Sequence, residues 1–129
     1  MNILIDTCVF LWLLIDDKKK LSETFLESFS DMNNTIYLSP VSVWEILVKH
    51  KTGKLPLPDN VIRDIVELRE NLLIQQLPVM EKHVLMLKKL PDLHQDPFDR
   101  LLICQALSDS LTFATPDQTI KEYPVNYIW

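Results

Sequence analysis

Hydrophobic positions along the chain form short aliphatic runs that alternate with longer amphipathic segments. Short runs rich in β-branched residues are typical of strands buried on both faces, whereas apolar residues spaced three or four apart indicate helices. This alternation predicts an α/β fold, in which helices flank both sides of a mostly parallel sheet. We expect strands at residues 2–6, 36–38, 73–77, 111–114 and 125–129, and helices at residues 9–15, 23–32, 40–52, 59–71, 79–89 and 97–109.

Start and stop signals support several of these boundaries. The serine–proline pair at residues 39–40 and the aspartate–proline pair at residues 96–97 each place a capping side chain before a proline at the first helical position. Gly53 is the expected stop of the helix that begins at residue 40. Because the chain has 129 residues, no repeats and no linker longer than a turn, we expect a single domain over residues 1–129.

The first predicted strand, residues 2–6, ends in a carboxylate. Three aliphatic residues lead into Asp6, and a helical segment follows Thr7 almost at once. In open α/β sheets, ligands bind outside the carboxyl ends of the strands, so Asp6 lies where such sites form. The helix at residues 9–15 is apolar nearly all round, which predicts that it is buried or partly covered by another chain.

Glu45 lies among large apolar residues of the predicted helix 40–52, where an unpaired carboxylate is costly. Two structural explanations are open: an ion pair with Lys49 one turn later, or a capping-box contact with Ser42. Considered alone, Glu45 is better explained by such contacts than by a function.

Basic residues gather at the end of the same helix. Favourable contact with the helix dipole is the simplest explanation for each lysine, and contact with a phosphate backbone is the functional alternative. The residues are Lys49, His50, Lys51 and Lys54.

Two further acids open the predicted helix 97–109. Asp96 is the expected N-cap, and it is also placed to pair with Arg100 one turn later. Asp99 falls in the first turn, where an acid stabilises a helix by a few tenths to about 1 kcal/mol. One cap suffices for one helix, so Asp99 still needs an explanation. Asp117 likewise begins a short helix after the fourth strand.

The predicted topology can bring these acids together. Carboxyl ends of parallel strands share one edge of the sheet, so Asp6 and Asp117 end near each other, and Asp99 joins them if the first and fourth strands are neighbours. Glu45 is about a turn and a half into the helix after the second strand. Four acids then face one crevice and repel one another unless a cation neutralises them. Oxygen ligands alone favour Mg²⁺ or Mn²⁺.

A divalent ion in such a crevice can activate a water and stabilise an in-line displacement at phosphorus, which points to a phosphodiester substrate. Thr7 and Thr115 are candidate donors that orient the carboxylates or the water. His94 is expected in a loop and His83 on a helix surface or half-buried. No Ser-His-Asp arrangement emerges, so metal-free nucleophilic catalysis has no support.

Composition narrows the remaining function classes. Gly53 is the only glycine, which excludes glycine-rich phosphate loops and therefore dinucleotide enzymes and P-loop NTPases. The net charge of −5 argues against a polyanionic partner only if the acids are spread out; four acids around a cation would leave the rest nearly neutral.

The expected location is the cytoplasm. Cys8 and Cys104 are isolated and fit reduced cytosolic thiols. The longest apolar run, residues 8–15, is far shorter than the ~20 residues that cross a bilayer. No basic leader precedes a hydrophobic stretch at the start of the chain, so we expect no signal peptide.

Several of these segments, in this order, resemble the PIN-domain ribonucleases, and among them the VapC-type toxins of type II toxin–antitoxin modules. They are Asp6-Thr7 after a short strand, Ser42-Val43-Trp44-Glu45-Ile46, Asp96-Pro97-Phe98-Asp99-Arg100-Leu101-Leu102 and Thr115-Pro116-Asp117. The resemblance covers the whole chain and implies a five-stranded parallel sheet with helices on both faces.

The resemblance also implies an activity: Mg²⁺-dependent cleavage of single-stranded RNA. The acidic quartet of the family falls on Asp6, Glu45, Asp99 and Asp117, with Asp6, Asp99 and Asp117 as metal ligands. It further implies a homodimer and a cognate antitoxin that covers helical surface near the site, for which the helix at residues 9–15 is suited.

Two other classes remain open. An aspartyl-phosphate phosphotransfer protein would use Asp6 as the nucleophile, but the strand continues as Asp6-Thr7-Cys8 and has no Asp-x-Asp pair. A non-catalytic binding module would use every acid as a cap or an ion-pair partner, and it would bind no Mg²⁺ or Mn²⁺.

Overall fold

The computed structural model describes all residues from Met1 to Trp129 and contains a five-stranded sheet in which every strand pair is parallel. The strand order is β3-β2-β1-β4-β5, so the first strand lies at the centre. The predicted α/β class with a parallel sheet of about five strands is confirmed. The strands are β1 (Asn2–Ile5), β2 (Thr35–Leu38), β3 (Gln75–Gln76), β4 (Thr112–Ala114) and β5 (Tyr127–Ile128).

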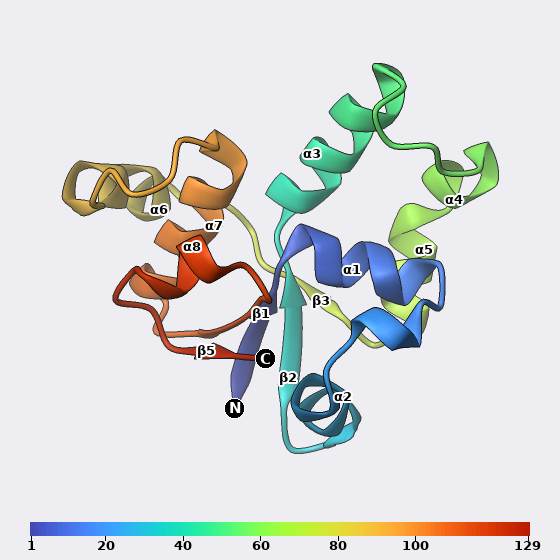
Figure 1. Cartoon of the computed structure of the whole chain (residues 1–129), viewed down its shortest axis with the longest axis horizontal. Helices are drawn as coiled ribbons and strands as arrows, with labels where there is room; N and C mark the ends of the chain where they lie inside the picture. The colour runs from blue at the N-terminus through green and yellow to red at the C-terminus, as the bar shows by residue number, and fades with distance from the viewer.

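Helices cover both faces of this sheet. One face carries α1, α2, α4 and α5, the other carries α6, α7 and α8, and α3 rises above the carboxyl edge between them (Figure 1). The helices are α1 (Thr7–Leu14), α2 (Glu23–Ser30), α3 (Pro40–Lys51), α4 (Asp59–Arg63), α5 (Ile65–Asn71), α6 (Glu81–Leu85), α7 (Pro97–Ser108) and α8 (Gln118–Lys121), with short 3₁₀ turns η1 (Lys18–Lys20) and η2 (Met86–Lys89). None of them is long and apolar enough to cross a bilayer.

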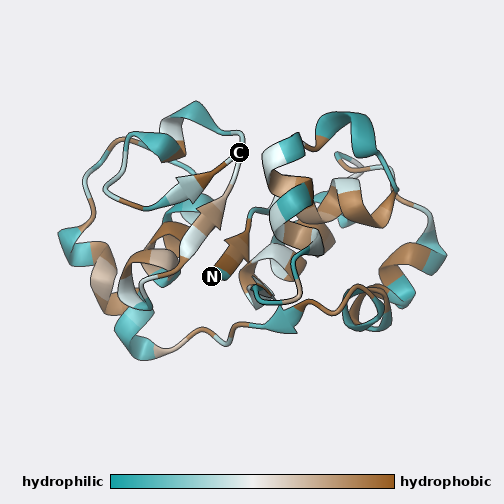
Figure 2. Ribbon diagram, turned by 90° about the horizontal axis from the view of Figure 1, so that it is seen from below, coloured by the Kyte–Doolittle hydropathy of each residue, from teal (hydrophilic) through white to brown (hydrophobic).

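Strand β1 divides the interior into two hydrophobic cores. Ile3 and Ile5 pack into the core beneath α1, α2 and α5, whereas Leu4 packs into the core beneath α7 and α8. All three side chains are fully buried, as expected for a central strand with helices on both sides. Hydrophobic residues accordingly concentrate on the central strand β1, whereas the edge strand β3 is hydrophilic (Figure 2).

The strand order reverses between β1 and β4. After β1 the chain builds β2 and β3 on one side, and then crosses to build β4 and β5 on the other. The backbone N–H of Asp6 donates to the carbonyl of Ala114 at 3.0 Å, which ties the two strand ends together. This reversal point is where open parallel sheets form their ligand crevices.

Three elements differ from the prediction. The third strand is only Gln75–Gln76, because Leu73 has a positive φ of 60° and leaves the extended conformation. The helix predicted over residues 59–71 divides at Asp64, whose φ and ψ of −102° and 16° end α4 before α5 begins. The helix predicted over residues 79–89 starts at Glu81 and tightens into a 3₁₀ turn at Met86.

The first helix is partly covered by the rest of the chain. Val9 and Phe10 are fully buried, whereas the helix end, with Ile15, is about half-exposed. Trp12 packs against Trp129 at the opposite end of the sequence, with ring centroids 6.0 Å apart. One side of the apolar helix α1 therefore packs into the core, and the other side lies at the surface.

His83 is buried, and its predicted place on a helix surface or half-buried is wrong. Its Nδ1 accepts the backbone N–H of Met80 at 2.8 Å, and its Nε2 contacts Asp109 at 3.0 Å. Asp109 also pairs with Lys82 at 2.7 Å. Burial alone would raise the pKa of Asp109, but the hydrogen bonds from Lys82 and His83 lower it overall. The partner lies 26 residues away, so periodicity along the helix could not reveal this contact.

Replacing His83 by alanine is expected to destabilise the fold. The change leaves the Met80 N–H and one Asp109 oxygen without partners in a buried place, which costs about 1–3 kcal/mol. Urea denaturation measures the loss. Lys82→Met is the matched control: it removes the exposed partner of Asp109 and is expected to cost less than about 1 kcal/mol. Equal losses in the two variants would contradict a buried role for His83.

Candidate metal centre

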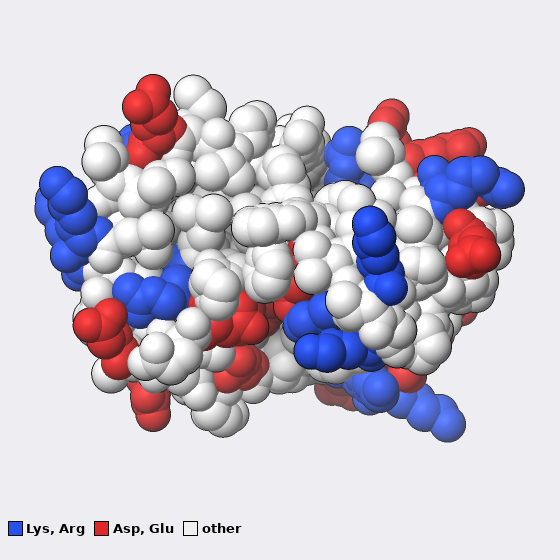
Figure 3. All heavy atoms as spheres, turned by 90° about the horizontal axis from the view of Figure 1, so that it is seen from above, with Lys and Arg blue, Asp and Glu red and all other residues white.

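An acidic cavity opens at the carboxyl edge of the sheet, where the strand order reverses. Seen from this edge, acidic side chains gather in a hollow near the middle of the molecule, and basic side chains lie beside them (Figure 3). The cavity has a volume of about 370 Å³. It is lined by Asp6, Thr7, Cys8, Leu11, Glu45, Ile46, Lys49, Lys54, Leu55, Asp96, Asp99 and Asp117.

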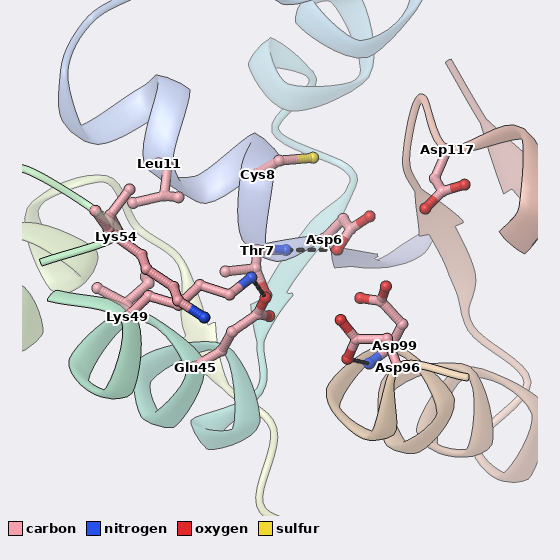
Figure 4. A pocket seen from close by; sticks show the side chains of 12 residues that line it. Asp6, Thr7, Cys8, Leu11, Glu45, Lys49, Lys54, Asp96, Asp99 and Asp117 are labelled. Carbon is pink, nitrogen blue, oxygen red and sulfur yellow. Dashed lines mark hydrogen bonds and ion pairs between the residues drawn. The ribbon is translucent and has the colours of Figure 1, made fainter. Parts of the chain in front are cut away.

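All four acids singled out in the sequence line this cavity, and each comes from a different part of the fold. Asp6 follows β1, Glu45 lies in α3, Asp99 lies in the first turn of α7 and Asp117 precedes α8. Their carboxylates point toward a common space (Figure 4). The four acids therefore line one cavity, and the catalytic and metal-binding roles of these residues stay predictions.

Asp6 is held by hydrogen bonds on both oxygens. Its Oδ1 accepts the backbone N–H of Thr7 at 2.7 Å and so caps α1, and its Oδ2 accepts the hydroxyl of Thr115 at 2.6 Å. The Thr7 hydroxyl in turn donates to Ser42 at 2.9 Å. The Thr115 hydroxyl thus orients the carboxylate as expected, whereas Thr7 contacts Asp6 only through its backbone N–H and uses its hydroxyl to join α1 to α3.

Glu45 pairs with Lys49 through Oε2, so one of the two structural explanations for this residue is realised. The alternative capping-box contact with Ser42 is not made, because the N-cap of α3 is Ser39 and the backbone N–H of Ser42 already donates to the Ser39 carbonyl. The ion pair leaves Glu45 Oε1 buried without any hydrogen-bond partner. Because a buried unpaired carboxylate oxygen is costly, this atom indicates that the site is completed by a further group.

Helix capping explains two of the acids only in part. Asp96 Oδ1 accepts the N–H groups of Phe98 and Asp99, and Asp117 Oδ1 accepts the N–H of Thr119 at 2.9 Å. Each cap uses one oxygen, and the second oxygen of each carboxylate remains for other contacts. Asp99 caps nothing.

The pair expected between Asp96 and Arg100 does not form. Arg100 reaches back over the preceding loop, where it contacts Asp92 at 3.3 Å and donates to the carbonyl of Pro91 at 3.0 Å. Asp96 meanwhile points its acceptor oxygen at the N-terminus of α7, away from the outer face on which Arg100 lies.

His94 belongs to the site, although in the sequence it was assigned only to a loop. Its Nε2 lies 2.9 Å from Asp99 Oδ2 and 3.7 Å from Asp117 Oδ2. One possible ligand atom from each of His94, Asp99 and Asp117 lies within 4.8 Å of the other two. Asp6 does not belong to a group of three that is spaced so closely. The only signal in the sequence is the short distance along the chain between His94 and Asp99.

Burial and crowding perturb the pKa values of two of these acids. Burial first, then the charges of Asp6 and Asp96, raise the pKa of Asp99 to about 8. Burial also raises the pKa of Asp6 to about 6, against the lowering effect of its hydrogen bonds with Thr115 and Thr7. Without a cation Asp99 therefore holds a proton at neutral pH, whereas Asp6 holds one only in mildly acidic solution, and a divalent ion would displace these protons.

The donor set fits a hard divalent cation. Carboxylate oxygens surround the cavity, and such ligands suit Mg²⁺ and Mn²⁺ rather than softer metals. Cys8 is the only sulfur in the lining, and burial followed by the charge of Asp6 raises the pKa of its thiol, so it stays protonated.

Basic residues complete the opposite wall of the cavity. The hydrogen bond with Glu45 raises the pKa of Lys49, which therefore stays charged. Lys54 lines the cavity as well and makes no ion pair. The cavity thus has an acidic end suited to a cation and a basic end suited to an anion (Figure 4).

A parallel α/β fold with clustered carboxylates at its switch point places acidic ligands where such folds bind their ligands. The family model named PIN domain matches residues 3–126 of the sequence. The chain therefore belongs to the PIN-domain family, as its motifs indicated. PIN domains are generally nucleases and typically depend on divalent metals. A search of curated proteins finds no significant match to the sequence.

Solved structures share the fold over nearly the whole chain. They include VapBC2 from Rickettsia felis bound to a promoter DNA fragment, with a TM-score of 0.75, 14% identity and coverage of 99% of this chain and 98% of that one. FitAcB from Neisseria gonorrhoeae has a TM-score of 0.63, 21% identity and coverage of 98% and 96%. VapBC-1 from nontypeable Haemophilus influenzae has a TM-score of 0.61, 19% identity and coverage of 99% and 97%.

The metal-free protein is expected to lose stability as the pH rises from about 4 to about 8. The pKa values of Asp6 and Asp99 are raised in the folded state to about 6 and about 8, so the folded state binds more protons than the unfolded state in this range. Their contribution is complete below the unfolded pKa of 3.8 and is lost as the pH passes the folded values. Urea midpoints measured across this range in the presence of a chelator test the expectation.

Asp99→Asn provides the control for this pH dependence. It removes the group with the larger rise in pKa, so its urea midpoint should change less with pH than that of the wild type. Added Mg²⁺ should flatten the wild-type profile as well, because a bound cation replaces the protons. A wild-type midpoint that rises steadily to pH 8 would contradict the arrangement.

Proposed function

We propose that this protein is a metal-dependent endoribonuclease that acts as the toxin of a type II toxin–antitoxin module. The observation that carries the proposal is the meeting of Asp6, Glu45, Asp99 and Asp117 in one cavity, with a buried oxygen of Glu45 left unpartnered. Membership of the PIN-domain family supports the nuclease class.

We assign the cation to Asp6, Asp99 and Asp117, with Mg²⁺ as the natural ion and Mn²⁺ as a suitable substitute. When bound, such an ion lowers the pKa of a coordinated water and stabilises the charge that develops on a phosphoryl group. The raised pKa values of Asp6 and Asp99 support this assignment, because they measure how strongly the pocket disfavours uncompensated negative charge.

The side chains of the protein position the remaining participants. Lys49 holds Glu45 Oε2, and Glu45 Oε1 is a buried acceptor without a partner, to which we assign the proton of the attacking water. In the hydrolysis we propose, the water oxygen bonds to phosphorus and one P–O ester bond breaks. The proton of the attacking water passes to Glu45, and the departing ribose oxygen takes up a proton from solvent water. Thr115 and Thr7 keep Asp6 in place throughout.

The proposed substrate is single-stranded RNA. Lys54 lies at the basic end of the cavity without an ion pair, so it is free to contact a phosphate next to the one that is cleaved. The helix-dipole explanation still suffices for the other residues at the end of α3. The acidic net charge does not oppose such a substrate, because the negative charge is concentrated where the cation binds.

The proposed partners are a cognate antitoxin and a second copy of the chain, in the cytoplasm. Support comes from the fold shared with the solved VapBC and FitAcB structures. The half-exposed end of α1 at Ile15 and the exposed Trp44 on α3 offer apolar surface for such contacts.

The two alternatives have less support. Both oxygens of Asp6 already accept hydrogen bonds and the side chain is only 5% exposed, which disfavours it as a phosphate-accepting nucleophile. A purely structural role explains the caps made by Asp6, Asp96 and Asp117. Contact with His94 gives Asp99 a structural partner as well, but a purely structural role does not explain the unpartnered oxygen of Glu45.

Asp6→Asn and Asp99→Asn are each expected to reduce cleavage of single-stranded RNA by at least about 100-fold, beyond the roughly 10–100-fold typical for loss of a residue that only supports a metal ligand. Asparagine still caps a helix, so α1 should remain folded in the Asp6 variant. Cleavage of a labelled RNA in Mg²⁺, with circular dichroism as the check on folding, provides the measurement.

Glu70→Gln is the matched control, since it removes the same charge from an exposed position on α5 and should cleave like the wild type. Undiminished cleavage by folded Asp6→Asn or Asp99→Asn would refute the assignment.

A further inference from the structure

His94 contacts two acids of the site from outside the cavity lining, and the proposed chemistry has not used its side chain. Its side chain is about one-fifth exposed and faces the carboxylates of Asp99 and Asp117. These two acids come from separate elements, α7 and the turn before α8, so the ring bridges parts of the chain that no backbone hydrogen bond joins at this point.

The hydrogen bonds of the ring identify its tautomer. His94 Nδ1 accepts the backbone N–H of Asp96 at 3.2 Å, so this nitrogen carries a lone pair and not a proton. The proton of the neutral ring is therefore on Nε2, which points at Asp99 Oδ2 at 2.9 Å. An Nε2 that carries a proton donates a hydrogen bond and cannot at the same time coordinate a metal ion.

The backbone around His94 is also fixed from outside the site. Its N–H donates to the hydroxyl of Tyr123 at 2.8 Å, and its carbonyl accepts from Arg100 at 3.3 Å. Arg100 reaches the carbonyl of Pro91 too, so the loop is closed on α7. With the backbone and Nδ1 both held, the ring has one orientation, and that orientation presents Nε2–H to the acids.

We propose that His94 is a positioning residue that donates Nε2–H to Asp99 and thereby leaves the other oxygen of Asp99 for the cation. This inference rests on the proposed function, because it assigns a role within the same metal centre. The single donated hydrogen bond holds the Asp99 carboxylate in one rotamer, and the same N–H lies 3.7 Å from Asp117, where it offsets part of the repulsion between the two acids. Residues that orient metal ligands in this way typically change metal affinity by 10–100-fold.

Glutamine can replace this function of histidine. Its side-chain amide carries N–H donors at about the distance of the imidazole Nε2, but it does not titrate and offers no ring nitrogen. Comparison of His94→Gln with His94→Ala therefore separates a donor from a metal ligand and from a proton-transfer group.

The experiment measures Mn²⁺ binding to the purified, metal-free full chain by calorimetry. His94→Ala should bind Mn²⁺ about 10–100-fold more weakly than the wild type, and His94→Gln should recover most of the loss. Tyr123→Phe removes the hydroxyl that holds the loop but keeps the His94 ring, so its affinity for Mn²⁺ should lie between those of His94→Ala and His94→Gln. His50→Gln is the control, because it replaces a histidine that lies outside the cavity and contacts Leu57.

Electron spin-echo spectroscopy of the wild-type Mn²⁺ complex gives an independent readout, in which we expect no coupling from a directly bound imidazole nitrogen. Such a coupling, a His94→Gln variant as weak as His94→Ala, or a folded His94→Ala with unchanged affinity would each overturn the proposal. If the wild type binds no Mn²⁺ at all, the proposed function fails and this inference fails with it. If Asp99→Asn loses Mn²⁺ binding and the His94 variants keep it, the metal centre is supported and the role of His94 is rejected.

Discussion

Electrostatic repulsion among carboxylates is the constraint on which this structure depends. Asp6, Glu45, Asp96, Asp99 and Asp117 share one cavity, although isolated charges at such range would separate or take up protons. The two hydrophobic cores on either side of β1 hold them there, because moving any one acid away would require a strand or helix to leave the sheet. This packing raises the pKa values of Asp6 and Asp99, first because it buries the two carboxyl groups and then because it holds them near other acids.

Helix capping reduces the cost of the cluster. Asp6, Asp96 and Asp117 each cap a helix, so three helix N-termini direct their N–H groups and positive dipole ends toward the acidic region. In Asp96 and Asp117 the cap occupies Oδ1 and leaves Oδ2 for other contacts. A structural explanation for these residues is thus compatible with a metal-binding one, since the two use different oxygens of the same side chain.

The remaining donors show how a PIN domain with this sequence arranges its site. Thr115 links the ends of the two strands at the switch point, because its hydroxyl donates to Asp6 while it accepts the N–H of Asp117. Lys49 neutralises one oxygen of Glu45 from within the same helix. Asp6 and Glu45 therefore each have partners that restrict the orientation of their carboxylates, and both side chains line the cavity (Figure 4).

Local patterns in the sequence were sufficient to predict the order of the elements and the caps at residues 39 and 96. They were also sufficient to predict a buried aliphatic strand and the convergence of four acids on one edge of the sheet. These features follow from spacings of two to four residues and from the rules of parallel sheets, which act wherever the pattern occurs. The same local rules placed His83 at the surface and left His94 in a loop. The partners of these histidines, Asp109 and the Asp99–Asp117 pair, are set by how α6, α7 and α8 pack. Only the tertiary structure decided which oxygen of each acid is free, because that depends on contacts between elements that are distant along the chain.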